Sequence, residues 1–293
     1  MKNITKLNRK RNIFDKLISF YIKLKRFIYD KHTLKFQRLK FSNLYTDIKK
    51  TPLITVYTPT YNRSKILKNR AIKSVLNQSY KKFEYIIVGD GCNDDTEKMV
   101  KKIKDKRIKF INLKRQKRYP EHEEYFMNHW YVGAVFASNV ALQNAKGEWI
   151  ARLDDWAIWT KDHLKDLLNH AQKNDYEFIT GASKSNGRKH HGHNLQYFGV
   201  NYPSKLRIGS TQTFFYRSYL TCFLYCINSW RHEKNKVNDL DLIHRMIKAG
   251  VKIGWLDKIV TIIRPRPGNK YTNSKAYLEM KRKNSNFFKF NEK

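Results

Sequence analysis

Cysteine, proline and glycine are all scarce in this sequence of 293 residues, and each scarcity excludes a class of protein. Three cysteines, Cys92, Cys222 and Cys226, are too few for a disulfide scaffold and indicate a reducing compartment. Six prolines and 12 glycines exclude collagen-like and low-complexity chains. We therefore expect a cytoplasmic protein with a buried apolar core, which a chain of this length can form.

Acidic residues are also few, because 25 Asp and Glu stand against 60 Lys and Arg, a formal net charge of +35. A positive charge of this size indicates nucleic acid, an anionic membrane surface or phosphate-bearing substrates as partners. The lysines are scattered along the chain, however, which equally fits a lysine-rich composition that fills solvated surfaces. No nucleic-acid-binding motif is present, so we expect no specific nucleic acid partner.

An uninterrupted apolar run is lacking at the N-terminus, where lysines break the pattern of a signal peptide or membrane-spanning helix. Residues 1–50 form a basic extension with 15 Lys and Arg against 3 acids. Its apolar side chains recur at helical spacing: Phe14, Leu17, Ile18, Tyr21, Leu24 and Ile28. Three interpretations stay open: a helix peripheral at an anionic membrane surface, a helix whose stripe packs on the main domain, and a disordered tail.

From residue 51 onward, strand and helix patterns alternate. The predicted strands are 53–58, 85–88, 108–113, 148–153, 178–180 and 259–263. The predicted helices are 66–77, 132–145 and 163–172, and the apolar run 213–230 is expected to be a buried strand and helix. This alternation predicts an α/β fold with a mostly parallel sheet covered by helices on both faces, which binds ligands at the carboxyl ends of its strands.

Polar motifs follow the predicted strands at those ends. They are 58–63 (TPTYNR), 89–96 (GDGCNDDT), 152–155 (RLDD), and a later helix start at 238–242 (NDLDL). Together with 77–80 (NQSY) and 145–149 (AKGEW), the series resembles family 2 glycosyltransferases of the GT-A fold. The resemblance runs from about residue 52 to 268 and implies a domain at 51–270, between the extension 1–50 and a basic tail at 271–293.

The resemblance implies a nucleotide-sugar donor, most simply a UDP-sugar, whose base is held by Asp90. It also implies that Thr58, Tyr61 and Arg63 frame the nucleoside pocket. From the residues alone, the alternative interpretation of Asp90 is a turn residue before a glycine. The alternative interpretation of Arg63 is a solvated cation in a loop.

Asp154 and Asp155 occupy the position of the family's D-x-D metal motif, which implies a divalent cation, Mn²⁺ or Mg²⁺. The sequence departs from the family pattern here, because Trp156 and Ala157 replace the last two carboxylates. Two interpretations remain: Asp155 takes the metal after a shift of the loop, or metal binding is weakened and the aspartates only bind the ribose. In the second case we expect Arg264, Arg266 or Lys270 to supply positive charge to the diphosphate.

Asp239 aligns with the family's catalytic base, although the preceding Glu of the family is Asn238 here. Asp241 points to another side of the helix, and a purely capping role for this segment is the alternative. We expect an inverting glycosyltransferase acting on a hydroxyl of a glycan or glycolipid acceptor. The competing interpretation is a catalytically degraded scaffold that binds nucleic acid or another polyanion.

Overall fold

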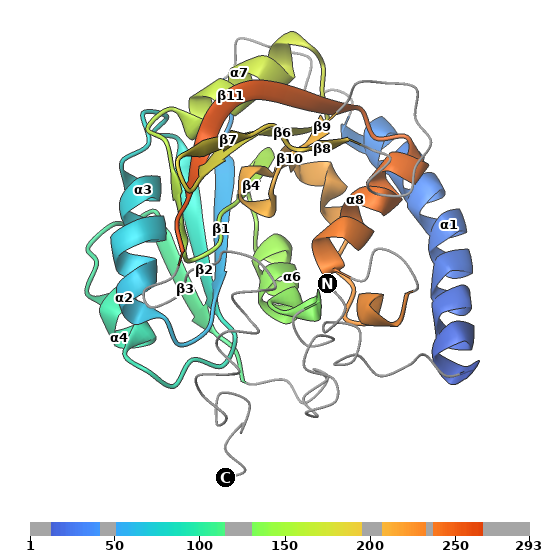
Figure 1. Ribbon diagram of the computed structural model, residues 1–293, viewed down its shortest axis with the longest axis horizontal. Helices are drawn as coiled ribbons and strands as arrows, with labels where there is room; N and C mark the ends of the chain where they lie inside the picture. The colour runs from blue at the N-terminus through green and yellow to red at the C-terminus, as the bar shows by residue number, and fades with distance from the viewer. Residues whose placement is uncertain (1–12, 42–50, 115–130, 195–206, 233–236, 266–293) are drawn as a thin grey trace.

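The computed structural model describes residues 13–41, 51–114, 131–194, 207–232 and 237–265. A nine-stranded sheet lies at its centre, in the order β3-β2-β1-β4-β10-β6-β11-β5, with β7 paired to β6 (Figure 1). A separate two-stranded sheet joins β8 to β9. The strands are β1 (Ile54–Thr60), β2 (Phe83–Gly89), β3 (Ile108–Asn112), β4 (Trp149–Arg152), β5 (Ala157–Trp159), β6 (Phe178–Ser185), β7 (Arg188–His190), β8 (His193–Asn194), β9 (Arg207–Ile208), β10 (Phe215–Arg217) and β11 (Ile253–Ile263).

The sheet is mostly parallel, as predicted. β1 pairs in parallel with β2 and β4, β2 with β3, and β6 with β11. β10 runs antiparallel between β4 and β6, and β5 runs antiparallel to β11. The helices are α1 (Ile13–Phe41), α2 (Ser64–Leu67), η3 (Lys68–Ile72), α3 (Lys73–Leu76), α4 (Thr96–Lys101), α6 (Val135–Gln143), α7 (His163–Lys173) and α8 (Asn238–Ala249), with 3-10 turns η6 (Thr211–Thr213), η7 (Ser218–Cys222) and η8 (Ser229–Arg231).

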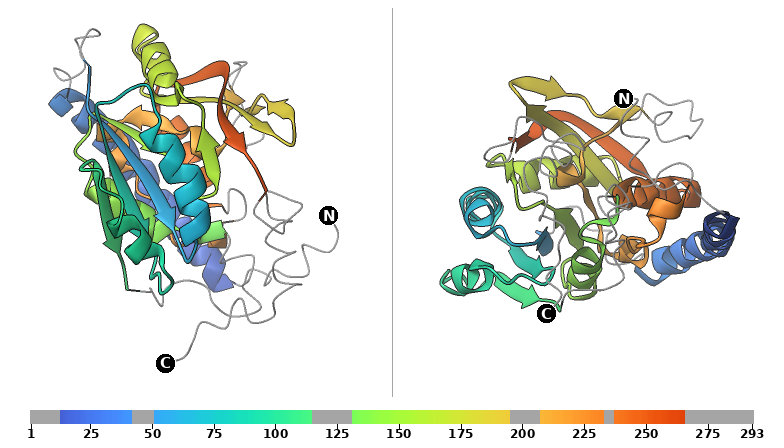
Figure 2. Two further views of the ribbon diagram at one scale, coloured as in Figure 1. Left: turned by 90° about the vertical axis from the view of Figure 1, so that its left-hand side faces the viewer. Right: turned by 60° about the horizontal axis from the view of Figure 1, so that its bottom comes forward.

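Helices cover both faces of the sheet (Figure 2). Two apolar cores lie between these helices and the sheet, one on each face. Successive side chains of a strand point to opposite faces, so Val56 joins the core under α2, α3 and α7, while Tyr57 joins the core under α6 and α8. Every residue of β1 is buried, as a strand covered on both faces requires.

The run 213–230 does not form the predicted strand and helix. It contains only the three-residue strand β10 and the 3-10 turns η7 and η8. β10 lies in the middle of the sheet, so its strand length is limited by its antiparallel pairing with the short β4 and with Phe178 and Ile179 of β6. Most apolar residues of this run are instead buried in the core that α6 and α8 cover, whereas Phe215 joins the core on the other face.

Close packing against β1 requires a glycine at position 147, in the AKGEW motif. A Cβ atom at Gly147 would lie 2.4 Å from the backbone nitrogen of Thr55, so only glycine allows the chain to pass this close to β1. The Gly147 backbone N–H also donates to Thr55 Oγ1 at 2.8 Å. This contact precedes β4 directly and brings that strand into register beside β1.

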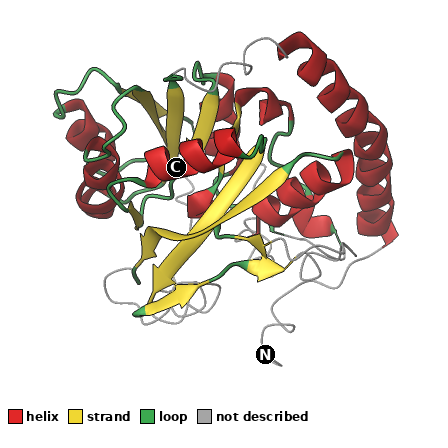
Figure 3. Cartoon of the chain, turned by 90° about the horizontal axis from the view of Figure 1, so that it is seen from above, coloured by secondary structure: helices red, strands yellow, loops and turns green. Residues whose placement is uncertain are grey.

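α1 is the long outermost helix, and it lies against α8 and the turns η7 and η8 (Figure 3). The prediction of a helix in the extension is therefore confirmed for residues 13–41. The interpretation that its apolar stripe packs on the main domain is wrong, since Phe14, Leu17, Tyr21 and Leu24 are all more than half exposed. In the described residues, no helix is long and apolar enough to cross a membrane.

Candidate active site at the carboxyl ends of the strands

Thr60, the last residue of β1, connects the predicted nucleoside and metal segments. Its backbone oxygen accepts a hydrogen bond of 2.8 Å from the N–H of Asp90, just after β2. Its Oγ1 donates to Asp155 Oδ2, just after β4, at 2.9 Å. Asp90 and Asp155 are 4% and 2% exposed. Parallel pairing of β1 with β2 and with β4 brings these three strand ends together, as the sequence predicts.

The two aspartates after β4 are each bound by an arginine. Arg63 Nη1 lies 3.1 Å from Asp155 Oδ1 and 3.3 Å from Oδ2. Arg152 Nε lies 3.2 Å from Asp154 Oδ1. With Thr60 on Asp155 Oδ2 and Gln212 Nε2 on Asp154 Oδ2 at 2.6 Å, all four carboxylate oxygens accept a hydrogen bond.

The turn η6 joins Asp154 to Asp239. Gln212 donates to Asp154, and its neighbour Thr211 donates from Oγ1 to Asp239 Oδ2. Asp239 Oδ1 also accepts a hydrogen bond of 2.8 Å from the N–H of Leu240. The predicted base therefore lies beside the predicted donor site, although the two segments are separated by more than 80 residues in the sequence.

Asp239 and Asp241 have different surroundings, as their spacing predicts. Asp241 accepts a hydrogen bond of 3.0 Å from Arg26 of α1, and His232 Nε2 lies 3.3 Å from its other oxygen. Burial alone would raise the pKa of Asp241, but the hydrogen bond from His232 and the charge of Arg26 lower it below its usual range. Asp241 is thus a structural carboxylate that holds α1.

Sequence reasoning missed a reciprocal amide pair in front of the site. Asn62 Nδ2 donates to Asn93 Oδ1 at 2.7 Å, and the Asn93 N–H donates to Asn62 Oδ1 at 2.9 Å. Asn62 has a positive φ of 49°, which asparagine tolerates better than most residues. The pair fixes the loop after β1 against the loop after β2. The signal available in the sequence was an Asn in each of the two motif turns.

Thr58 and Tyr61 take different positions relative to this site. The Thr58 side chain is fully buried, and its hydroxyl lies 2.9 Å from the hydroxyl of Tyr85. Tyr61 is partly exposed in the loop after β1. The described geometry therefore brings Tyr61, but not the Thr58 side chain, to the surface beside Arg63, and the nucleoside roles of both remain predictions.

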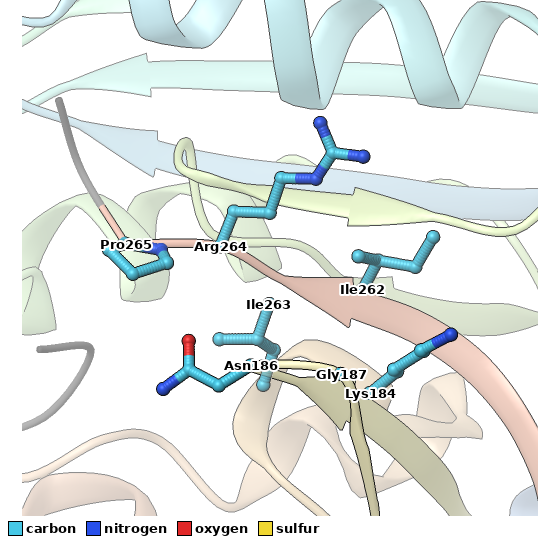
Figure 4. Close-up of a pocket in the computed structure, with 7 residues that line it drawn as sticks. All are labelled: Lys184, Asn186, Gly187, Ile262, Ile263, Arg264 and Pro265. Atoms are coloured by element: carbon cyan, nitrogen blue, oxygen red, sulfur yellow. The ribbon is translucent and has the colours of Figure 1, made fainter. Parts of the chain in front are cut away.

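Arg264 follows β11 on the side of the site that carries Trp156. Arg70 Nη1 donates to the backbone oxygens of Trp156 and Arg264, at 3.0 and 3.1 Å, and ties these segments together. Arg264 also lines a hollow of about 310 Å³ between β11 and the β6–β7 turn, and Figure 4 shows its guanidinium extending away from Asn186. None of the predicted aspartates lines this hollow. Arg266, Lys270 and the tail 271–293 lie outside the described residues.

Arg152 is a buried cation behind Asp154. It is 5% exposed, and its guanidinium lies 4.9 Å from the centre of the Tyr225 ring. Burial opposes its charge, but the neighbouring Tyr225, Asp154 and Tyr57 hold the pKa of Arg152 well above its usual value. Its Nη1 is buried without a hydrogen-bond partner in the described structure.

A divalent cation does not fit the two carboxylates as they are arranged here. Their four oxygens already accept hydrogen bonds, three of them from arginine cations. Nowhere in the described ranges do three or more His, Cys, Asp or Glu side chains form a group that could hold a metal ion. The Mn²⁺ or Mg²⁺ site at Asp154 and Asp155 stays a prediction.

Comparison with known proteins settles the family. The sequence pattern described as glycosyl transferase family 2 matches residues 55–235, more than half of the chain. The chain belongs to this family. The matched segment includes Asp90, Asp154 and Asp155, whereas Asp239 lies just beyond it.

Two curated relatives of this family 2 chain come from Escherichia coli. One is the candidate colanic acid biosynthesis glycosyl transferase WcaA of strain K12, 37% identical over 129 residues, 43% of this chain and 40% of that protein. The other is UDP-Glc:alpha-D-GlcNAc-diphosphoundecaprenol beta-1,3-glucosyltransferase WfgD, 30% identical over 129 residues, 44% of this chain and 45% of that protein. The chain thus matches less than half of each relative's length.

Two solved structures confirm the GT-A fold of this family 2 chain. Mannosyltransferase PcManGT from Pyrobaculum calidifontis, in complex with GDP-Man and Mn²⁺, has a TM-score of 0.56 at 14% identity, covering 87% of this chain and 68% of that one. S. aureus TarS 1-349 has a TM-score of 0.53 at 22% identity, covering 72% of this chain and 60% of that one. The predicted mostly parallel sheet with helices on both faces is confirmed.

Proposed function

We propose that the chain is an inverting glycosyltransferase that moves a sugar from a nucleotide-diphosphate donor to a hydroxyl of a glycan or glycolipid acceptor. One observation carries the proposal. Thr60 connects Asp90 to Asp155, and the neighbours Thr211 and Gln212 connect Asp239 to Asp154. Four carboxylates from three separate segments therefore lie together at one edge of the sheet, where open α/β sheets bind ligands.

A uridine nucleotide is the donor that we favour. WfgD is named as an enzyme that uses UDP-Glc, and TarS has been solved in complex with UDP. In our proposal the carboxylate of Asp90 accepts a hydrogen bond from the N–H of uracil. Tyr61 and Arg63, in the loop that the Asn62–Asn93 pair holds, flank the nucleoside. The name of WfgD also supports a lipid-linked glycan as the acceptor class.

The chemical step that we propose is a single in-line displacement. The acceptor hydroxyl oxygen attacks the anomeric carbon while the bond from that carbon to the diphosphate oxygen breaks. The electron pair of that bond leaves with the nucleoside diphosphate, and Asp239 accepts the hydroxyl proton. Asp239 is suited to this role because it is only partly buried and accepts hydrogen bonds from two neutral donors, the Thr211 hydroxyl and the Leu240 N–H.

Positive charge must offset the developing charge of the leaving diphosphate. Arg63 and Arg152 are fixed beside Asp155 and Asp154, and arginine stays protonated at any physiological pH. Arg264, on the side of Trp156, is a third source, as expected from the sequence. We propose that these guanidiniums contribute charge that cations supply in relatives, and no step of the proposed reaction depends on a metal.

Purified full-length protein, assayed with a panel of nucleotide sugars, tests the proposal. Thermal shift of the protein with each donor, with and without Mn²⁺, identifies the ligand, and release of nucleoside diphosphate measures turnover and donor hydrolysis. Stabilisation by one nucleotide sugar together with release of its diphosphate supports a transferase. Strong, salt-dependent DNA binding with no response to any donor would favour the degraded, polyanion-binding scaffold instead.

A further inference from the structure

The helix α1 turns its apolar face to the solvent, whereas an ordinary surface helix buries its apolar face. Its exposed face carries ten large apolar side chains that are 52–77% exposed: Ile13, Phe14, Leu17, Phe20, Tyr21, Leu24, Ile28, Tyr29, Phe36 and Leu39. Outside α1, no large apolar side chain of the described ranges is exposed. An apolar face of this kind on one helix marks an interaction surface.

The docked face of α1 is mostly polar, with Leu34 buried in the core near its C-terminal end, and ion pairs hold it to the main domain. Arg231 pairs with Asp15, Arg26 with Asp241 at 3.0 Å, and Arg245 with Asp30 at 2.7 Å. Arg38 binds both oxygens of Glu177, at 2.7 and 2.6 Å, and the backbone oxygen of Gly250 at 2.7 Å. Ser19 Oγ lies 2.9 Å from His232 Nδ1. These contacts orient the helix and keep its apolar face outward.

The exposed charges of α1 all have one sign. Both of its acids, Asp15 and Asp30, are buried on the docked face. Six lysines are exposed: Lys16, Lys23, Lys25, Lys31, Lys35 and Lys40. At about 100° per residue, Lys16 and Lys23 border the stripe formed by Leu17, Leu24 and Ile28 on one side, and Lys25 borders it on the other. The outward face is therefore an apolar stripe with a purely cationic border.

We propose that the outward face of α1 binds the surface of an anionic lipid bilayer. Apolar and aromatic side chains flanked by lysines match a surface that is apolar below and negatively charged above. A second copy of the chain fits poorly, because a symmetric contact would set the cationic borders of two α1 helices against each other. Residues 266–293 also fit poorly, because they hold 8 Lys and Arg against 2 acids.

The proposed bilayer contact would lie near the candidate site, because α1 lies beside α8. α1 runs in the same direction as α8, as the pairs Arg26–Asp241 and Asp30–Arg245 show, and the apolar N-terminal half of α1 lies beside the first turn of α8 (Figure 1). That turn also carries Asp239. A bilayer bound to α1 would therefore lie about one helix diameter, ~10 Å, from α8.

Flotation of the full-length protein with lipid vesicles tests this proposal. We expect binding to vesicles of phosphatidylcholine with phosphatidylglycerol, and much weaker binding to phosphatidylcholine alone. The triple variant Lys16→Gln, Lys23→Gln, Lys25→Gln should bind anionic vesicles roughly a hundredfold more weakly, from about a fivefold contribution per lysine. Its matched control is Lys102→Gln, Lys104→Gln, Lys106→Gln, which removes the same charge from exposed positions after α4, at the opposite edge of the molecule (Figure 1).

A second variant separates insertion of the apolar stripe from plain attraction of a basic protein. Leu17→Gln with Leu24→Gln keeps the net charge, and both side chains are more than half exposed, so the melting temperature should not fall. We expect at least a tenfold loss of vesicle binding. Undiminished binding by this variant, or equal losses in the two lysine variants, would overturn the proposal. So would a dimer that Leu17→Gln with Leu24→Gln dissociates, or vesicle binding that appears only after residues 266–293 are removed.

Discussion

Arg63 donates from a single guanidinium nitrogen to both carboxylate oxygens of Asp155, at 3.1 and 3.3 Å. Asp155 is 2% exposed and also accepts from Thr60, so the ion pair is largely shielded from water. We propose that the Arg63 guanidinium supplies positive charge at the position where the resemblance to the family implies a divalent cation. The two residues that follow Asp155 are Trp156 and Ala157, which carry no carboxylate.

The first prediction is that transfer depends more on Arg63 than on a metal. We expect turnover to fall less than about tenfold in EDTA, which is ~1.4 kcal/mol of barrier. Arg63→Gln should lower turnover by about 10²–10³, the usual loss when a fixed donor to a developing charge is removed. Lys65→Gln, an exposed change two residues away, is the control. Complete loss in EDTA, restored by Mn²⁺, with Arg63→Gln silent, would establish an ordinary metal site.

The second prediction separates the two aspartates of α8. Asp239→Asn should lower turnover by ~10²–10⁴, because a general base is lost, while donor affinity and the melting temperature stay unchanged. Asp241→Asn should lower the free energy of unfolding by about 1–3 kcal/mol, because Arg26 and His232 lose their charged partner. Initial rates and denaturant unfolding of both variants decide this. Near-normal turnover by Asp239→Asn would remove it as the base.

The third prediction concerns the nucleoside. Asp90→Ala should weaken binding of UDP about tenfold to a hundredfold, the typical effect of losing one hydrogen bond to a charged group. Asp94→Ala, an exposed change in the same loop, should leave the affinity unchanged. Isothermal titration with UDP measures both. If Asp90→Ala binds UDP as well as the unchanged protein does, the residue serves only the turn after β2.

The fourth prediction concerns stability below neutral pH. His163 is fully buried, stacks on Trp159 and contacts the Val260 backbone oxygen, and burial lowers its pKa to about 3. Between the pKa of the unfolded chain, near 6.5, and about 3, the unfolded state binds a proton that the folded state does not. The free energy of unfolding should therefore fall as the pH drops below 6.5, approaching about 1.4 kcal/mol per pH unit from this residue.

His163→Phe keeps the stacking on Trp159 and removes the titrating group, so it should flatten this slope between pH 6.5 and 4.5. Urea unfolding at several pH values measures the slope for both proteins. Because aspartates and glutamates titrate mainly below this window, they should contribute little to the difference. Parallel curves for the two proteins would show that His163 does not control the loss of stability.

The position of the site was predictable from the sequence, because strands of a parallel sheet end at one edge. β1, β2 and β4 were recognisable as short apolar runs followed by polar turns, and this placed Asp90, Asp154 and Asp155 together. The position of Asp239 at the start of a helix was predictable from the NDLDL motif. The Asn62–Asn93 pair was not, since nothing in the sequence indicates which side chains of two turns will meet.

The partners of the charged groups were decided only by the tertiary structure. Asp155 pairs with Arg63, which is 92 positions away in the sequence, and Asp241 pairs with Arg26, which is 215 positions away. Neither pair therefore leaves a local pattern in the sequence. The amphipathic pattern of α1 could be predicted from the sequence, because it depends only on residue spacing. Which face of the helix is buried could not be predicted. Which face of a helix is buried depends on what the rest of the fold presents to it, and here the main domain presents Arg231, Asp241 and Arg245, so the polar face docks and the apolar face remains outside.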